Sequence, residues 1–350
     1  MILTERRLNR TLLLRQHLLS RVAMTPAEMI EHLVGLQAQD QLPPFFALAA
    51  RLESLDPYAL SAQLEASELV RLSSLRSTIH MHTAADAALI RAWTQPVHDY
   101  YTQRVEIIRP AAQLPGFVEA TEDVLALGAL PNAALEAGLV DHFPGVPAKA
   151  LGLRARNELP LVQLPPRGLW KGSGGLVYDL LPRWTGVSPV EVEDVVPSLA
   201  PEIVRRFLRA FGPATAADIT AWSSLTRLGP VIKRIDGLVT YRDEAGKTLY
   251  DVPDAPIATG EEHAPVRLLG TYDNLWLAHA NRERITAKGT RKEWGIARGG
   301  AVILAGGHLV GLWKPVDGEV VVQKMLRDLT PDERDELAEE TARVEALLAG

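Results

Sequence analysis

The chain contains no cysteine, and this single absence excludes several classes of protein. Disulfide-bonded scaffolds, thiolate zinc sites, iron–sulfur clusters and cysteine nucleophiles all need the thiol group. Long apolar runs are also missing, since none reaches the roughly 18 residues of a membrane-spanning helix. The first residues form an amphipathic pattern and not a signal peptide with a small-residue cleavage site. We therefore expect a cytoplasmic protein that does not associate with a membrane.

An excess of positive charge, the usual mark of a nucleic-acid-binding protein, is missing as well, since 37 basic residues stand against 43 acidic ones. The deficit is concentrated at one end of the sequence. Residues 331–350 carry seven acidic and two basic side chains, so the net charge of −6 shrinks to −1 for the preceding 330 residues. A nearly neutral body can still present a basic face. The densest basic stretch is 282–298, although a solvated charged surface is the commoner explanation of such a run.

The order of helix and strand signals predicts an α+β protein built from repeated winged-helix units. In a winged helix two helices are followed by a short β-hairpin, and this order recurs three times. In the first unit Thr4, Thr25-Pro26 and Asp56-Pro57 are helix-start signals. Residues 68–83 then predict two strands around a bend.

The later units follow the same order. The second is predicted from helices at 131–140 and 147–157 and strands at 161–164 and 175–180. The third is predicted from helices that begin at Thr215 and Ser224 and strands at 237–241 and 248–252. After a Pro-rich and acidic linker at 253–265, strands are predicted at 266–269, 301–304, 308–313 and 319–323, with a final helix from Thr330 to about Leu348. We therefore divide the chain into winged-helix units at 1–112, 113–190 and 198–253 and a C-terminal β-rich subdomain with the final helix at 265–350.

The segment 36–39, Leu-Gln-Ala-Gln, places two neutral amides two positions apart, shortly before Pro43 and Pro44. Side chains at positions i and i+2 point apart on a helix but share a face on an extended segment. If Gln37 and Gln39 act together, the backbone must leave helical geometry there or the pair must sit at a helix end, and the prolines favour an early end of the helix. An amide cannot take up a proton at neutral pH, but it can hold and orient a water molecule. Taken alone, the pair is most simply explained as polar surface residues at a helix end.

Four segments in a fixed order resemble a known protein family. They are the opening helix with Arg6 and Arg10, the block 35–39, the block 75–80, and the block 267–275 followed by His279 and Arg282. Over nearly its whole length the chain resembles the tandem winged-helix DNA glycosylases of the AlkZ group, which unhook interstrand crosslinks. The resemblance implies a curved DNA-binding surface and no cofactor, and it identifies Gln37 and Gln39 with the family's catalytic Gln-apolar-Gln motif. A related branch has Asp at the second position, where this chain has Gln39.

Two uncharged amides suffice only for a reaction whose leaving group is already activated. Alkylation at N7 of guanine places a positive charge on the base and weakens its glycosidic bond, and the sugar then gains oxocarbenium character as the base departs. Amide oxygens can orient the attacking water and turn their dipoles toward that charge. We therefore expect a monofunctional DNA glycosylase that hydrolyses cationic N7-alkylguanine lesions, leaves abasic sites and spares normal bases. No lysine lies at the motif to support a lyase step.

The resemblance also implies the substrate and the setting. A base tethered to both strands cannot swing freely into a deep pocket, so a crosslink must be reached on an open surface. The expected partner is double-stranded DNA carrying alkylated or crosslinked guanine. Azinomycin-type crosslinks, and self-resistance to such an antibiotic, are what the resemblance points to. We expect a monomer that acts on the bacterial nucleoid.

Candidate DNA contacts are basic, histidine or hydroxyl residues in four parts of the chain. They are Arg76, Thr78 and His80 on a predicted strand, Lys171 beside the Gly-rich segment 172–175, Arg227, Lys233 and Arg234 on a predicted recognition helix, and His279, Arg282, Arg284, Lys288, Arg291 and Lys292 in the late basic stretch. The strand residues can equally be structural, and a winged helix can be a packing module, so both interpretations stay open. The Gly-rich segment lacks the lysine of a phosphate-binding loop and is expected to be a wing tip.

Two further features have simple explanations. His80 and His82 would share one face of a strand, but no third ligand is suitably spaced, so no metal site is expected. Asp273 is expected to orient a neighbouring arginine rather than to act as a second carboxyl group at the site.

The alternative function is a winged-helix transcription regulator without catalysis, and a weaker one is a structural nucleic-acid-binding protein. A regulator would prefer one operator sequence and would tolerate the loss of both glutamines. A glycosylase would make abasic sites at lesions without sequence preference, and it would need the glutamines.

Overall fold

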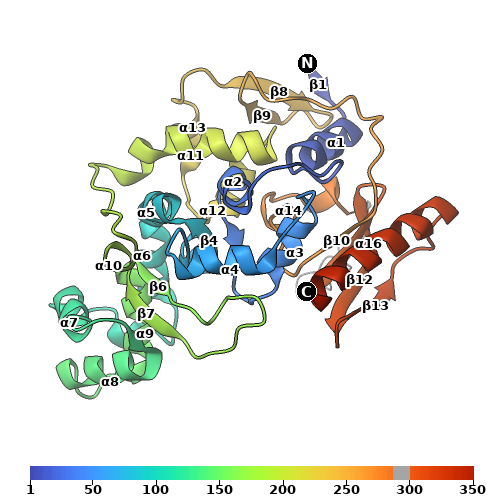
Figure 1. The fold of residues 1–350 in the computed structure, drawn as a ribbon. Coiled ribbons are helices and arrows are strands. Elements are labelled where there is room, and N and C mark those ends of the chain that lie inside the picture. Colours follow the sequence, from blue (N-terminus) through green and yellow to red (C-terminus); the bar gives the residue numbers. More distant parts are fainter. Residues whose placement is uncertain (287–299) are drawn as a thin grey trace.

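In the described residues, 1–286 and 300–350 of a computed structural model, three β-sheets with helices packed against them form the predicted α+β fold (Figure 1). The largest sheet orders six strands as β2 (Leu36–Gln37), β4 (Ile79–Thr83), β3 (Leu69–Ser73), β6 (Leu161–Gln163), β7 (Val177–Leu180) and β5 (Leu130–Pro131). A second sheet orders β10 (Arg267–Leu269), β11 (Ala301–Ala305), β12 (His308–Val316) and β13 (Glu319–Met325). The third orders β1 (Ile2–Leu3), β8 (Val239–Asp243) and β9 (Thr248–Asp251).

Short capped helices make up most of the first predicted unit. They are α1 (Glu5–Arg15), α2 (Pro26–His32), α3 (Pro43–Ala49), α4 (Pro57–Glu65), α5 (Ala84–Trp93) and α6 (Gln95–Arg104). Thr4, Thr25 and Asp56 accept backbone N–H groups at the starts of α1, α2 and α4, as predicted. Pro43 and Pro44 are not a stop. Helix α2 has already ended before them, and they begin α3 because proline fits the first turn of a helix.

The hairpins of the first two predicted units join in one sheet. Strand β3 pairs antiparallel with β6, where Leu72 lies opposite Val162. The second unit adds α7 (Phe117–Val124), α8 (Asn132–His142), α9 (Ala148–Glu158), α10 (Leu181–Thr185) and the 3-10 turn η2 (Arg109–Ala111). Helices α8 and α9 and strands β6 and β7 agree with the predicted ranges to within a few residues, whereas α7, α10 and η2 were not predicted. A small apolar core of their own includes Phe117, Leu151 and Tyr178.

Helix α11 (Val195–Phe211) joins the third predicted unit to the first. Its buried residues Phe207 and Phe211 belong to the same apolar core as Leu12 of α1 and Trp93 of α5. The first and third units therefore share one core, although more than a hundred residues of sequence separate α5 from α11.

The predicted recognition helix is shorter than expected. The sequence predicts a helix from Ser224 that carries Arg227, Lys233 and Arg234, whereas α12 (Ala216–Ser223) is followed by α13 (Leu228–Ile232) alone. Ser224 and Arg227 have left-handed backbone angles, with φ of 64° and 60°, and such residues do not continue a right-handed helix. The three basic residues therefore flank α13 rather than lie along it.

The predicted linker at 253–265 is held along α1 by arginine side chains. It contains neither helix nor strand. Its carbonyl groups accept hydrogen bonds from α1 in four pairs: Arg6 to Gly260, Arg7 to Ala258, Arg10 to Glu262 and Arg15 to Pro256. Arg15 also forms a buried ion pair with Asp251 of β9 at 2.8 Å. The linker is therefore an ordered strap across the first helix.

The final helix, α16 (Pro331–Ala349), packs on β10 and β13 of the second sheet. Thr330 and Glu333 cap it reciprocally, as the sequence predicts. Glu340 on this helix accepts hydrogen bonds of 2.5 and 2.7 Å from Arg21, which ties the C-terminal subdomain to the first unit. Among the described residues no helix combines the length and the apolar character needed to cross a membrane.

Candidate active site

Gln37 lies in an edge strand of the six-stranded sheet, and Gln39 lies in the bend that follows this strand. Strand β2 pairs antiparallel with β4, and Gln37 lies opposite His80. This pairing confirms the prediction that the backbone leaves helical geometry at the motif. Gly35 makes the turn from α2 into β2 with a φ of 93°, and a Cβ atom on it would lie 2.2 Å from the His82 ring. Only glycine fits this turn, because it alone tolerates both the positive φ and the close approach.

Gln37 lines a surface cleft of about 380 Å³. Its side chain is largely buried, with 9% of the residue exposed, and its Oε1 accepts a hydrogen bond of 2.7 Å from Arg76 Nη2. The other lining residues are Arg76, Thr78, Tyr101, Ala221, Ser224, Tyr272, Trp276, Leu277 and Arg282. The sequence did not single out the aromatic ones. Tyr101 lies in α6, whereas Tyr272 and Trp276 lie just before and within α14 (Asn274–Leu277), far away in the chain.

Gln39 is exposed and lines a second cleft of about 280 Å³. Its Oε1 accepts a hydrogen bond of 3.3 Å from the backbone N–H of Ile79. Tyr101 lines both clefts, so the surroundings of the two amides meet at its side chain. Each amide oxygen uses one lone pair inside the protein and keeps a second one for water. Neither cleft is lined by an Asp or Glu among the described residues.

Arg76, predicted on a strand, lies instead in the 3-10 turn η1 (Leu75–Ser77), and its backbone is left-handed with a φ of 56°. Its guanidinium donates to the Trp222 carbonyl at 2.6 Å, to Gln37 Oε1 at 2.7 Å and to His80 Nε2 at 3.1 Å. Burial, followed by the charge of Arg282, lowers the pKa of Arg76 to about 10. The structure thus brings the predicted residues Arg76 and His80 to Gln37, but through hydrogen bonds inside the protein.

His80 and His82 share one face of β4, as predicted, and their rings stack with centroids 5.9 Å apart. His80 is buried, and its Nδ1 lies 2.9 Å from the Thr78 carbonyl. Burial, and then the charge of Arg76, keep the pKa of His80 well below its usual value. Burial likewise lowers the pKa of His82 to about 4. The described part of the chain contains no group of three His, Cys, Asp or Glu side chains that could hold a metal ion.

Residues of the late block 267–275 hold the turn that precedes the motif in place. Asp273 forms a buried bidentate ion pair with Arg51, with distances of 2.7 and 2.8 Å, which confirms that it orients a neighbouring arginine. The next residue, Asn274, donates through Nδ2 to the Gly35 carbonyl at 2.6 Å, across 239 positions of sequence. The turn that leads into the motif is therefore held by the C-terminal part of the chain.

The predicted contacts on the wing and around α13 lie apart from the two clefts. The three basic residues that flank α13 are exposed. Lys171 is exposed in the long loop between β6 and β7 that contains the Gly-rich segment. This loop does not project as a free wing tip, because the neighbouring Trp170 is buried against Phe45, with ring centroids 4.9 Å apart.

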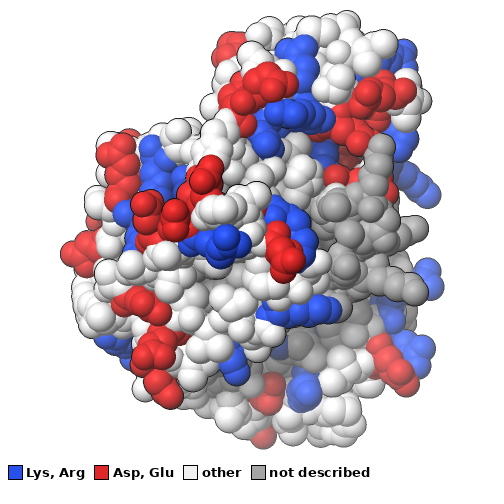
Figure 2. Space-filling model, turned by 90° about the vertical axis from the view of Figure 1, so that its right-hand side faces the viewer, with Lys and Arg blue, Asp and Glu red and all other residues white. Residues whose placement is uncertain are grey.

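The late basic stretch is divided among several environments. His279 is buried, and its Nε2 lies 3.0 Å from both the Phe211 carbonyl and Arg284 Nη1. Arg282, in the 3-10 turn η3 (Arg282–Arg284), lines the Gln37 cleft. Lys288, Arg291 and Lys292 lie outside the described residues. On the face drawn in Figure 2, the described acidic and basic side chains are intermixed rather than gathered into one basic patch.

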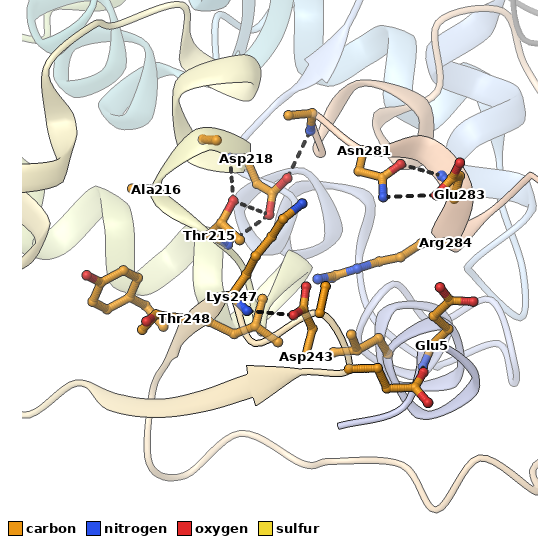
Figure 3. A pocket seen from close by; sticks show the side chains of 17 residues that line it. Glu5, Thr215, Ala216, Asp218, Asp243, Lys247, Thr248, Asn281, Glu283 and Arg284 are labelled. Carbon is orange, nitrogen blue, oxygen red and sulfur yellow. Dashed lines mark hydrogen bonds between the residues drawn. The ribbon is translucent and has the colours of Figure 1, made fainter. Parts of the chain in front are cut away.

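A larger cavity, of about 630 Å³, lies between α1, the start of α12 and the β8–β9 hairpin. Arg284 extends into it toward Asp243 and Lys247 (Figure 3). The other charged groups that line it are Glu5, Asp218, Glu244 and Glu283. The Asp218 carboxylate is already occupied, since it accepts the N–H groups of Thr215 at 2.8 Å and Ala280 at 2.9 Å. Five carboxylates against two basic groups make this cavity unfavourable for DNA phosphates.

Known proteins share this fold and about a fifth of the aligned residues. Residues 30–347 match the family model described as DNA glycosylase AlkZ-like. The chain is 23% identical over 333 residues to an interstrand DNA cross-link repair glycosylase of Streptomyces sahachiroi, a match that covers 88% of this chain and 87% of that protein. The solved structure of Streptomyces sahachiroi DNA glycosylase AlkZ matches with a TM-score of 0.81 at 20% identity, covers 100% of this chain and 98% of that one, and confirms the α+β fold. The chain therefore belongs to the AlkZ-like family of DNA glycosylases.

Proposed function

We propose that this enzyme hydrolyses the N-glycosidic bond of cationic N7-alkylguanine in DNA, including guanine held in an interstrand crosslink. The observation that carries the proposal is the chemistry of the motif: two amides, one in strand β2 and one in the bend that follows it, line clefts without a carboxylate among the described residues. A glycosylase site without a carboxylate as general acid or base suits a substrate that brings its own activation. N7-alkylguanine does so, because its positive charge lets the base depart as a neutral molecule.

Gln37 and Gln39 act by positioning water. The second lone pair on each amide oxygen accepts a proton of the attacking water, and the negative end of each amide dipole faces the charge that develops on the sugar. Normal guanine would have to leave as an anion, and neither cleft is lined by a described Asp, Glu or His that could protonate it as it departs. Selectivity for damaged DNA then follows from leaving-group chemistry.

Exposure of the motif suits a crosslinked substrate. Gln39 is exposed, so its amide can be reached by a lesion that stays in the duplex. For backbone contacts we propose Lys171, Arg227, Lys233 and Arg234, which are exposed, and Arg282 at the cleft. His80 and His279 are buried and offer no surface to DNA in this conformation.

The biological setting is the part of the proposal that rests on relatives. The Streptomyces sahachiroi relative is named as an interstrand DNA cross-link repair glycosylase. We propose that this chain likewise repairs interstrand crosslinks. From the resemblance in sequence we further propose that it acts as a monomer on bacterial DNA in the cytoplasm, on azinomycin-type crosslinks, and thereby gives self-resistance to such an antibiotic. Membership of a glycosylase family does not favour the alternative of a transcription regulator.

The test compares three duplexes of one sequence that carry N7-methylguanine, a neutral alkylated base or an interstrand crosslink. After incubation with enzyme, alkali converts abasic sites into strand breaks that a denaturing gel resolves. We expect cleavage at N7-methylguanine and unhooking of the crosslink, with little cleavage at the neutral lesion. Equal rates on the cationic and neutral lesions would contradict the proposal.

A further inference from the structure

We propose that Arg76 is a positioning residue that holds the Gln37 amide in the orientation that hydrolysis needs. This inference rests on the proposed function of Gln37. It replaces the expectation from the sequence that Arg76 contacts DNA. The direction of its hydrogen bonds, the protonation of His80 and the local backbone each support it.

Both protons of Arg76 Nη2 are used inside the protein. Nη2 donates to Gln37 Oε1 at 2.7 Å and to His80 Nε2 at 3.1 Å, while Nη1 donates to the Trp222 carbonyl at 2.6 Å. A guanidinium group offers donors only, so the Gln37 atom that faces it must be the oxygen and not the amide nitrogen. A glutamine amide otherwise rotates between two orientations of similar energy. Arg76 therefore excludes the orientation in which the NH₂ group takes the place of the oxygen.

His80 completes the arrangement as a neutral acceptor. Its Nδ1 lies 2.9 Å from the Thr78 carbonyl, which can only accept, so Nδ1 carries the proton and Nε2 presents a lone pair to Arg76. A protonated His80 would instead turn a donor toward a donor. Burial, together with the neighbouring Arg76, His82 and His98, lowers the pKa of His80 and keeps the ring neutral.

The backbone around Arg76 is shaped for this contact. Arg76 and Ser77 both have left-handed angles, with φ of 56° and 54°, which residues other than glycine adopt at an energetic cost. The Trp222 carbonyl belongs to α12, so the third unit helps to orient the catalytic motif of the first. The three acceptors, on Gln37, His80 and Trp222, are all neutral. The guanidinium therefore orients the Gln37 amide and does not form an ion pair with a carboxylate.

The experiment measures single-turnover excision of N7-methylguanine from a duplex, with enzyme in excess. The proteins are wild type, Arg76→Ala, Arg76→Lys, Gln37→Ala and the two double variants. We expect both Arg76 variants to slow excision about 10-fold or more, the scale seen when partners that orient a functional side chain are lost. Neither should slow the Gln37→Ala enzyme further, because Arg76 acts through Gln37. Millimolar guanidinium should restore part of the Arg76→Ala rate but none of the rate of the double variant.

The matched control is Arg154→Ala. Arg154 is also buried and donates to backbone carbonyls, of Ala111 at 2.6 Å and Leu114 at 3.3 Å, but it lies in the core of the second unit. This variant should lower the melting temperature without slowing excision. If Arg76→Ala does not fold, Arg76→Lys carries the test, because lysine keeps the charge and donor protons on one nitrogen but lacks the second nitrogen by which Arg76 is also anchored to the Trp222 carbonyl.

Each contrary outcome has a distinct meaning. A wild-type rate in Arg76→Lys and Arg76→Ala overturns the positioning role. DNA affinity can also be measured at several salt concentrations. If the slope of log affinity against log salt concentration is shallower by about 0.9 in the Arg76 variants than in wild type, Arg76 is a phosphate contact instead. Extra slowing on top of Gln37→Ala shows that Arg76 acts independently of Gln37 and also overturns the proposal. Failure of the wild-type enzyme to excise N7-methylguanine at all overturns the proposed function, and this inference falls with it.

Discussion

The two clefts at the glutamine motif and the cavity beside α12 differ in size and, more usefully, in charge. The cavity is larger, about 630 Å³ against about 380 and 280 Å³ for the clefts. Five carboxylates line the cavity, whereas none lines either cleft in the described part of the chain. Arg282 and Arg284 are two positions apart, yet the first faces the Gln37 cleft and the second faces the acidic cavity.

The comparison teaches that charge, rather than volume, distinguishes the proposed active-site clefts from the larger cavity. A DNA phosphate that approached the larger cavity would meet charges of its own sign. The carboxylate-free clefts allow DNA to approach and, for the same reason, provide no general base. Under the proposed function, such a site acts on a base that is already activated to leave.

The largest expected effect separates the two regions by activity. Replacing Gln37 and Gln39 together with Ala should slow excision of N7-methylguanine by about 100-fold or more, the scale of losing groups that stabilise a developing charge. Asp243→Asn in the acidic cavity should change the rate by no more than about twofold. Single-turnover assays measure both. The comparison breaks if the Asp243 variant is the slower enzyme.

Glycine substitutions compare the backbones of the two regions. Gly35→Ala should destabilise the protein by about 3 kcal/mol or more, because its Cβ would lie 2.2 Å from the buried His82 ring at a φ of 93°. Gly246→Ala, in the hairpin beside the acidic cavity, has a φ of 79° but open space around it, so about 1 kcal/mol of strain is expected. Urea unfolding measures both. Equal losses would show that the turn before the motif can relax.

Buried histidines should make stability depend on pH in both regions. Burial lowers the pKa of His82, behind the motif, to about 4, and burial with the charge of Arg284 lowers the pKa of His279, near the cavity. Their folded values lie below the unfolded value of about 6.5, so the unfolded chain binds protons first. Stability is complete above about pH 6.5 and is lost as the pH falls toward about 4, by about 2 kcal/mol for each histidine at about pH 5.

Urea unfolding at several pH values checks this loss. His82→Gln and His279→Gln should each remove part of the dependence on pH. His142→Gln, an exposed position on α8, is the control and should leave the dependence unchanged. Stability that stays constant down to about pH 5 would show that neither buried ring is held neutral by the fold.

The smallest expected effect is on the pH profile of the rate. Excision by wild type should be nearly constant between about pH 6 and pH 8, because the described cleft residues include no carboxylate and the pKa of His80 is well below its usual value. Gln39→Glu adds a carboxyl group, so its rate should fall as the pH drops through the pKa of that group. Steady rates against pH for both enzymes test this. A wild-type profile with a clear midpoint would reveal a titrating group at the motif.

Local signals sufficed to predict α1, α2, α4, α8, α9, α12 and α16 and the hairpins. Caps at Thr25, Asp56 and Thr215 and the hairpin at 239–251 act within a few residues, and the structure confirms them. The sequence analysis did not single out α5, α6, α7 or α11. Among the elements that it did predict, two errors occur where the backbone is left-handed. Arg76 lies in a turn rather than a strand, and α13 is short because Arg227 cannot continue a helix. No pattern of side chains in the sequence predicts these left-handed backbone angles, because contacts with residues far away in the chain stabilise them.

The sequence by itself determined that a capped helix precedes the two amides and that they can act together only where helical geometry ends. The resemblance it carries identified their family, because caps, turns and ordered motifs depend on residues that are close in the sequence. Only the tertiary structure decided which groups surround the amides. Arg76 reaches Gln37 across a turn, Asn274 holds Gly35 from the far end of the chain, and Tyr101 joins the two clefts. These contacts depend on units that share one sheet and one core, and that packing is a property of the whole chain and not of any segment.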